Sequence, residues 1–494
     1  MRGRRIRKRQ VCVTSQAEKR KHGTVPFSDK IGYGIGNFAT GISIQVVGAY
    51  LVFFSTAILH MPGSLVGLIV SIGIVWDAVT DPVMGYISDH TKSKRFGRRH
   101  LYVIIGTIGM AIVNYFIWAV SDAGSVALKF TVMLLLILLM KTFMTIYTTP
   151  YTALGAEMST DYDERTSIQG IKTIFFLLGL VFVTVFGLYV IFQPTGSYPV
   201  GQLNPAAYPR LGLTTSVLIL IFGLACFVGT KRYIPILQAS HKPPEQAFNL
   251  KNMIVDMVRI FKNLPFRSVA FAYMFNNLAS AIVSNLGLHV FTYTFSLDSQ
   301  KIALIVGAQF ATSILGQPLW AVITKKTDKK NALRLAILIS IVSSVLFALL
   351  VLSRGVVAQN VVYFLPFSIL AGFGLGGMFT VPLSMIADVI DQDELKSGER
   401  LEGIFFGSLT LFYKFSQSIT LVLVGFLLDI LKFDSTKNVQ LPSTAVSLGL
   451  FFALGSLVAF VLAMISIGYY NLNRQKIEEI QMQLRVKSKK SANS

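Results

Sequence analysis

The chain has 494 residues, of which 53% are hydrophobic and only 14% are charged, and its mean hydropathy is +0.60. Soluble proteins carry charge on about a quarter of their residues, so this composition excludes a soluble globular protein and indicates a polytopic membrane protein. The formal net charge of +21 would suit nucleic-acid binding, but the positions of the charges give another explanation. The two cysteines, Cys12 and Cys226, provide neither a disulfide framework nor a metal site.

Residues 1–27 are polar and basic and contain no apolar run, so they predict a cytoplasmic tail and not a signal peptide. Beyond them, apolar stretches alternate with charged or Gly- and Pro-containing breaks. Each stretch is long enough to cross a bilayer as a helix. The stretches predict twelve spans, at residues 28–56, 63–88, 100–120, 127–156, 168–193, 210–230, 267–294, 300–324, 332–352, 359–388, 402–430 and 444–471.

The basic residues follow the order of these spans. With the N-terminus inside, 37 of the 45 Lys and Arg residues fall on inner segments and 6 on outer ones. The remaining two, Lys141 and Lys414, fall inside spans. Because cytoplasmic loops carry an excess of Lys and Arg, both termini are predicted to be cytoplasmic. The same bias explains the net charge without nucleic acid, and it predicts a multi-pass protein of the cell membrane.

A long inner connection at residues 231–266 divides the spans into two sets of six, at 28–230 and 267–471, followed by a cytoplasmic tail at 472–494. In each half, a basic inner loop is followed two spans later by an acidic inner segment. The sequence therefore predicts an all-α membrane protein with twelve transmembrane helices in two six-helix halves. This is a transporter architecture, in which the binding site lies at the interface of the halves near the midplane.

The second span contains two carboxylates, Asp77 and Asp81. Each costs about 2.5–3.5 kcal/mol or more at the bilayer centre, which indicates a function. Asp77, Thr80 and Asp81 share one helix face, and Pro82 frees a backbone carbonyl one turn earlier, near Ala78. These oxygens suit a small hard cation or a proton. The alternative is a pair of acids neutralised by basic neighbours for packing alone.

Lys141 lies midway along the fourth span, at the depth expected for Asp77. Lys141, Thr145, Thr148 and Thr152 have helical spacing and form one polar stripe. The negative charges of Asp77 and Asp81 are balanced by the positive charges of Lys141 and Lys414. Buried charges are usually tolerated only when they are balanced in this way. A lysine held against the acids would compete with Na⁺, so H⁺ is the expected coupling ion. The alternative is a lysine that extends to the membrane surface or pairs with helix ends.

Other polar residues in the spans are candidates for a substrate cavity. The seventh span has a polar stretch that includes Asn277 and His289, and the first span contributes Gln45 and Tyr50. These side chains suit hydroxyl-bearing ligands. The alternative is hydrogen bonding between helices, worth about 0.6 kcal/mol per contact in membranes.

The acidic inner segments are predicted to form an inner gate with the basic loops. Exposed ion pairs are worth about 0–1 kcal/mol each, so several weak pairs would close a gate that can reopen. The alternative is a set of solvated loops. In the first half, the acids Glu157, Asp161, Asp163 and Glu164 are matched with Arg95, Arg98 and Arg99. In the second half, Asp388, Asp391, Asp393 and Glu394 are matched with Lys325, Lys326, Lys329 and Lys330.

Several of these motifs together have the pattern of a known family. The most specific are Trp76–Pro82, the loop Lys94–Arg99, Pro150–Leu154 with Asp163–Arg165, Ala387–Asp391 leading to Arg400, and Lys414. With them the sequence resembles the glycoside–pentoside–hexuronide:cation symporters, the melibiose-permease group of the major facilitator superfamily. The resemblance covers nearly the whole chain and implies the major facilitator fold.

The resemblance implies roles for individual residues. Asp77 and Asp81 match the family's Na⁺, Li⁺ or H⁺ site, and Thr145 matches a fourth-span threonine of that site. Thr80 stands where the family often has Asn, and Thr148 where the melibiose branch has an acid. In the sugar site, Gly41 replaces an acid, and Lys172 is the nearest residue to an expected arginine. Phe379 and Thr410 match an aromatic and a threonine of the tenth and eleventh spans, and Lys414 matches a family lysine.

The function predicted is secondary transport of a glycoside or small oligosaccharide, driven by Na⁺ or H⁺. No cofactor is expected, no metal beyond a possible Na⁺, and no partner other than the substrate, the cation and the lipid bilayer. The alternatives are symport of a lysolipid or another organic solute, a channel, or a membrane-embedded enzyme. No nucleophile–base set or nucleotide-binding loop in the sequence supports an enzyme.

Overall fold

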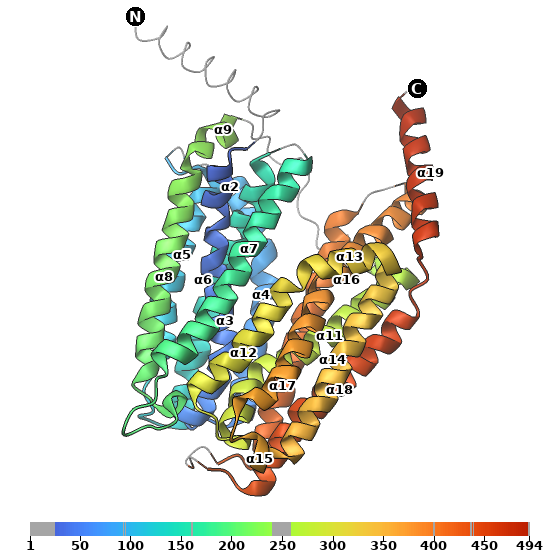
Figure 1. Cartoon of the computed structure of the whole chain (residues 1–494). Coiled ribbons are helices and arrows are strands. Elements are labelled where there is room, and N and C mark those ends of the chain that lie inside the picture. The colour runs from blue at the N-terminus through green and yellow to red at the C-terminus, as the bar shows by residue number, and fades with distance from the viewer. Residues whose placement is uncertain are drawn as a thin grey trace, which may run out of the picture. The chain divides into compact units, whose positions relative to one another are not determined.

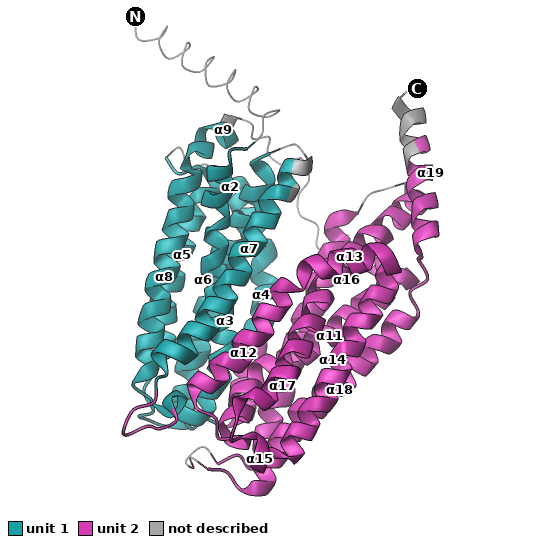
Figure 2. Cartoon of the chain, in the orientation of Figure 1, with its two compact units in different colours: residues 1–61, 72–193, 201–248 teal, residues 62–71, 194–200, 249–494 magenta. Residues whose placement is uncertain are grey.

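A computed structural model describes residues 25–91, 93, 95–159, 162–239, 258–398, 401–434, 437 and 439–492. Within these residues, the secondary structure is helical and the segments between helices are short (Figure 1). The chain divides into two compact units (Figure 2). Unit 1 contains residues 1–61, 72–193 and 201–248, and unit 2 contains residues 62–71, 194–200 and 249–494.

The described residues of the first half form six long helical segments. Two of them end in π-helical turns, at Phe54–Ile58 and Gly187–Ile191. The helices are α2 (Phe27–Gly34), α3 (Gly36–Phe53), α4 (Gly63–His90), α5 (Gly97–Trp118), α6 (Val126–Glu157), α7 (Tyr162–Phe186), α8 (Ala207–Thr230) and α9 (Ile234–Ala239), with 3₁₀ turns at Gly201–Leu203 and Lys231–Tyr233.

The second half repeats this pattern and adds a C-terminal helix. A π-helical turn at Val290–Thr294 continues its first helix, and a 3₁₀ turn at Val361–Phe364 precedes its fourth long one. The helices are α11 (Leu264–His289), α12 (Ser299–Leu315), α13 (Gln317–Thr327), α14 (Lys329–Leu352), α15 (Arg354–Val357), α16 (Leu365–Ser397), α17 (Glu402–Ile430), α18 (Pro442–Gly468) and α19 (Arg474–Ala492).

Among the described residues, eleven helices are long and apolar enough to cross a membrane, and the pair α12 and α13 makes a twelfth if the two count as one bent span. The pair bends by 46° where Gly316 and Pro318 interrupt the helix. Proline has no N–H to donate and its ring clashes with the preceding turn, which explains the bend. The twelve predicted spans match these helices within several residues at most ends.

The tenth span differs most from its predicted limits. It was expected to end at Asp388, but α16 continues to Ser397. The added residues include Gln, Glu, Leu and Lys, which favour helix, and the helix ends where Gly398 adopts a left-handed conformation with φ of 79°. The acidic segment of the second half, predicted to lie on the inner side, is therefore part of a helix as far as Ser397 and not a loop.

In each unit, the long helices pack against one another in pairs. In unit 1, α5 packs against α6 and α8, and α3 against α7. In unit 2, α11 packs against α17 and α18, and α16 against α12 and α14. The first residues of α4 belong to unit 2, where the carboxylate of Asp429 accepts hydrogen bonds from the backbone N–H groups of Gly63 (2.7 Å) and Ser64 (3.0 Å). A carboxylate at a helix N-terminus is favourable because of the helix dipole.

Candidate functional site

The second-span carboxylates and the fourth-span lysine lie together in unit 1. Asp77 and Asp81 are one turn apart on α4, and Lys141 extends from the middle of α6. Nζ of Lys141 lies 2.8 Å from Oδ2 of Asp77. Both side chains are sheltered, with 21% of the lysine and 14% of the carboxylate exposed. Lys141 therefore lies at the depth of Asp77, as the sequence predicts, and its ammonium pairs with this carboxylate and not with a helix end.

The second carboxylate is bonded to a hydroxyl of α6. Thr145 on α6 donates a hydrogen bond of 2.6 Å to Oδ1 of Asp81. The hydroxyl of Thr80 donates to the backbone carbonyl of Trp76 and lies 3.5 Å from the Thr145 hydroxyl. The indole N–H of Trp76 donates to Thr142 at 2.8 Å, a link between α4 and α6 that the sequence analysis missed. The i, i+3 spacing of Thr142 and Thr145 was the available signal.

Two predicted substrate residues of unit 1 meet where α6 and α7 approach each other. Nζ of Lys172 donates to the Thr152 hydroxyl at 3.2 Å and lies 5.3 Å from the centre of the Tyr151 ring. Asn37 donates to the backbone carbonyl of Lys172 at 3.0 Å, which anchors this part of α7 to α3. Thr148 is half-buried on the same α6 stripe. An ammonium and a hydroxyl thus lie together above a buried tyrosine ring.

The first-span candidates lie in the contact between α3 and α7. Gln45 donates to the Thr184 hydroxyl at 2.9 Å. Tyr50 is 1% exposed, and its hydroxyl donates to the Thr184 backbone carbonyl at 3.0 Å, so the structure gives it a packing role and not the predicted place in a cavity. At Gly41, an added Cβ would lie 2.4 Å from the carbonyl oxygen of Phe176. The close approach of the two helices therefore requires glycine at Gly41.

In unit 2, three predicted residues lie on two long helices. Lys414 is half-buried near the middle of α17, and Thr410 is exposed one turn earlier, with its hydroxyl bonded to the backbone carbonyl of Phe406. Phe379 on α16 has 42% of its surface exposed. Thr410 and Phe379 are therefore both exposed on the surface of unit 2.

The seventh-span candidates are buried instead. Asn277 is 2% exposed and donates to the backbone carbonyl of Tyr273, one turn earlier on α11. His289 is fully buried, with its ring packed edge-on against Phe433 at 5.5 Å between centres. Of the two alternatives predicted for them, a cavity or helix packing, the burial of both side chains within unit 2 favours packing. Polarity in the sequence did not distinguish a cavity from a helix contact.

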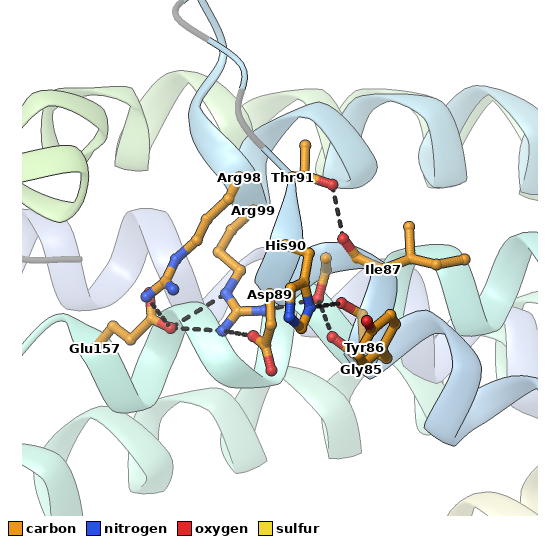
Figure 3. A network of polar contacts seen from close by, with 10 residues as sticks. Gly85, Tyr86, Ile87, Asp89, His90, Thr91, Arg98, Arg99 and Glu157 are labelled. Carbon is orange, nitrogen blue, oxygen red and sulfur yellow. Dashed lines mark hydrogen bonds and ion pairs between the residues drawn. The ribbon is translucent and has the colours of Figure 1, made fainter. Parts of the chain in front are cut away.

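At the predicted inner end of unit 1, one carboxylate joins two arginines (Figure 3). Oε1 of Glu157, at the end of α6, lies 2.9 Å from Nη2 of Arg98 and 2.7 Å from Nη2 of Arg99. Arg99 also contacts Asp89 at 2.6 Å and donates to the Ser88 hydroxyl. The pairing of Glu157 with Arg98 and Arg99 expected from the sequence is present, and Asp89 is an additional member that the sequence analysis missed.

The remaining gate residues of unit 1 are arranged differently. The guanidinium of Arg95 lies 5.2 Å from the centre of the Phe96 ring. Glu164 forms an ion pair with Lys30 at 2.8 Å and accepts a hydrogen bond from the backbone N–H of Val25. Its predicted partners were the loop arginines, so the structure gives it a different partner. Asp161 and the side chain of Asp163 lie outside the described residues.

In unit 2, Lys329 binds both oxygens of Asp388 at 2.7 Å. Asp388 is 4% exposed, so this is a buried ion pair and not a surface one. Asp391 accepts a hydrogen bond of 3.2 Å from Gln481 on α19. A cavity of about 640 Å³ adjoins Asp388 and is bounded by α13, α16 and α19. Arg400 lies outside the described residues.

Described residues that are helical throughout, with this many potential membrane spans and an acid–lysine cluster midway along two of them, are typical of a membrane transporter. The family of the protein follows from comparison with known sequences. Residues 32–474 match the family described as "MFS/sugar transport protein", where MFS is the major facilitator superfamily. The chain belongs to this family, and it is a multi-pass membrane transporter and not an enzyme.

Relatives with curated names are similar over almost their entire length. The uncharacterized symporter YnaJ of Bacillus subtilis is 27% identical over 93% of this chain and 95% of its own. The putative glycoside/cation symporter YagG of Escherichia coli is 24% identical, over 92% and 94%. The sodium-dependent lysophosphatidylcholine symporter 1-A of Danio rerio is also 24% identical, over 96% and 91%. These relatives support cation-coupled symport as the mode of action.

Solved structures support the fold. The nucleoside transporter NupG superposes with a TM-score of 0.57 over 90% of this chain and 98% of its own, at 16% identity. A bacterial homologue of the lysosomal transporter Spinster gives a TM-score of 0.60 over 93% and 96%, at 12% identity. At these identities the likeness shows the major facilitator fold alone.

Proposed function

We propose that the protein imports a glycoside or small oligosaccharide across the cell membrane together with a cation, Na⁺ or H⁺, with both termini in the cytoplasm. The observation that carries this proposal is the cluster of Asp77 and Asp81 with Lys141 and Thr145, at mid-depth in the bundle of unit 1. Ionisable groups are costly in a membrane interior, and a chain that places three of them together there uses them for a coupling ion.

Coupling needs no covalent chemistry. If cation and solute each bind one conformation of the transporter more tightly than the others, each shifts the population toward that conformation. The carboxylates supply the charge that the cation neutralises. A conformational change that moves charges through a low-dielectric region is then favoured only when the cluster is loaded. Solute and cation therefore cross together.

The substrate class is inferred from the polar groups outside this cluster. Lys172 and Thr152 present an ammonium and a hydroxyl, groups that suit the hydroxyls of a sugar. In unit 2, the accessible Phe379 and Thr410 offer an aromatic surface and a further hydroxyl. The family description and the name of the Escherichia coli relative support the same class.

A lysolipid is the second candidate. It is favoured by the similarity to the Danio rerio symporter over 96% of the chain, and by Lys172, whose ammonium would pair with a phosphate. A lysolipid also requires a continuous apolar groove for its acyl chain. The sugar proposal does not have this requirement.

A counterflow assay distinguishes these solutes. Purified protein is reconstituted in liposomes loaded with an unlabelled solute, and entry of the labelled solute is measured for a panel of aryl and alkyl glycosides, disaccharides, nucleosides and lysophosphatidylcholine. We expect entry for a glycoside that is lost in Lys172→Ala and retained in Lys262→Ala, a control outside the described spans. Entry of lysophosphatidylcholine or a nucleoside without any glycoside would contradict the proposed substrate class.

A further inference from the structure

The ammonium of Lys141 is held against Asp77 by the geometry of two helices. Lys141 is fifteen residues from the start of α6 and sixteen from its end. At 1.5 Å per residue, either end is about 23 Å away, far beyond the reach of a lysine side chain. The ion pair of 2.8 Å with Asp77 is therefore the way in which this charge is accommodated in the bundle.

A glycine on α4 makes room for the lysine. An added Cβ at Gly73 would lie 3.5 Å from Cγ and 3.8 Å from Cε of Lys141, and 3.1 Å from Ile137. The aliphatic stem of Lys141 thus runs over the bare backbone of α4, one turn before Asp77. One residue along α6 from Lys141, Thr142 accepts the indole hydrogen bond of Trp76. The position of the ammonium is set from both helices.

This arrangement changes what the acid pair can bind. With Asp77 engaged by Lys141 and Asp81 bonded to Thr145, a metal ion that used both carboxylates would lie close to a fixed positive charge. Like charges about 4 Å apart repel strongly enough to weaken binding by about a thousandfold near a protein surface. The ammonium also occupies one of the carboxylate oxygens that would coordinate the ion.

We propose that Lys141 is a tethered cation that excludes Na⁺ from the Asp77 and Asp81 carboxylates in this protein. The proposal rests on the proposed cation site, but not on the identity of the solute. Lys141 thus determines which ion the site accepts. Replacing Lys141 by a neutral side chain of similar size converts the cluster into a site with two carboxylates, at which Na⁺ binds.

The test measures Na⁺ binding to the purified full-length protein, without any solute. Binding of radioactive sodium and the melting temperature are followed as NaCl replaces choline chloride at constant ionic strength. Wild type is expected to bind sodium weakly and to melt at the same temperature in both salts. In Lys141→Met, we expect an increase of at least tenfold in Na⁺ affinity and a melting temperature that rises with Na⁺.

Three controls separate charge from structure. Lys141→Arg keeps the positive charge and is expected to behave as wild type. Lys129→Met removes another buried lysine of α6, which bonds to Asp122 and to the carbonyl of Leu59, and is expected to gain no Na⁺ binding. Asp77→Asn in the Lys141→Met background is expected to lose the gained binding.

Two results would overturn the proposal. One is tight Na⁺ binding by wild type that Lys141→Met leaves unchanged. The other is absence of Na⁺ binding in a folded Lys141→Met protein, and Lys141→Gln serves as the second neutral variant if Lys141→Met does not fold. A wrong assignment of the glycoside affects none of these measurements, because no solute is present.

Discussion

The hydroxyl of Thr145 lies 2.6 Å from Oδ1 of Asp81 and ties the carboxylate of α4 to α6. A hydrogen bond to a charged acceptor contributes about 1.5–3 kcal/mol to stability. Thr145 is 3% exposed, so the hydroxyl that makes this bond is buried. The contact therefore both supports the fold of unit 1 and positions the second acid of the proposed cation site.

Replacing Thr145 by valine, which has the same shape without the hydroxyl, is expected to destabilise the protein by about 1.5–3 kcal/mol. The measurement is the unfolding of the purified protein by heat and by denaturant. Thr131→Val is the matched control, because Thr131 is exposed on the same helix and bonds only to a carbonyl of its own helix in the contacts described. Equal stability of the two variants would contradict this role for Thr145.

Asp77→Asn is expected to abolish cation-driven accumulation of solute while leaving some exchange of solute for solute. Asparagine keeps the size of the side chain but cannot neutralise a cation, so the coupling step is lost and the solute site remains. Accumulation against a gradient and counterflow are measured in the same liposomes. Asp122→Asn, at a half-exposed carboxylate, is the control. Normal accumulation in Asp77→Asn would show that the pair is not the cation site.

Arg98→Glu is expected to impair transport, because it places two acids together where Arg98 and Glu157 now lie 2.9 Å apart. Adding Glu157→Arg should restore transport only in part, since Arg99 also binds Glu157 and would then face a second arginine. Uptake rates of the single and double variants are compared with Arg95→Glu, whose guanidinium lies over Phe96. No recovery in the double variant would argue against a gate built on this pair.

The second half has a related pair that is more deeply buried. Lys329→Met leaves the carboxylate of Asp388 buried without its partner, and breaking a buried ion pair in this way costs about 3–5 kcal/mol. We expect a lower melting temperature and little transport. Lys326→Met removes an exposed charge from the same segment and is the control. If the two variants have the same melting temperature, the buried pair is not required for the stability of unit 2.

The sequence predicted the elements that depend on periodicity and charge. Apolar run length placed the spans, and equal depth in neighbouring spans brought Lys141 to Asp77, because helices of fixed rise cross the same bilayer. The same reasoning could not identify partners that depend on side-chain direction. Glu164 pairs with Lys30, and Glu157 is shared by two arginines, because the packing of α6 and α7 decides which acid is within reach.

Burial was the other feature that polarity alone did not predict. Tyr50 and His289 are polar residues within spans, but each is buried inside its own unit by neighbouring helices. Which neighbouring helix covers each of these side chains depends on how the helices pack, and the polarity of a single residue does not reveal this.

The ion that drives uptake gives the last prediction. Because the ammonium of Lys141 is held 2.8 Å from Asp77, an inward Na⁺ gradient is expected to stimulate solute uptake by wild type little, whereas an inward proton gradient stimulates it strongly. Lys141→Ala and Lys141→Asn should raise the stimulation by Na⁺, since both remove the competing charge. Uptake is measured in liposomes under each gradient separately, with the membrane potential held constant by potassium and valinomycin. The Lys129→Met variant, altered at a lysine twelve residues away on α6, is the control and should respond as wild type. Strong Na⁺ stimulation of wild type that persists unchanged without Lys141 would show that the ion pair stabilises the helices and does not select the ion.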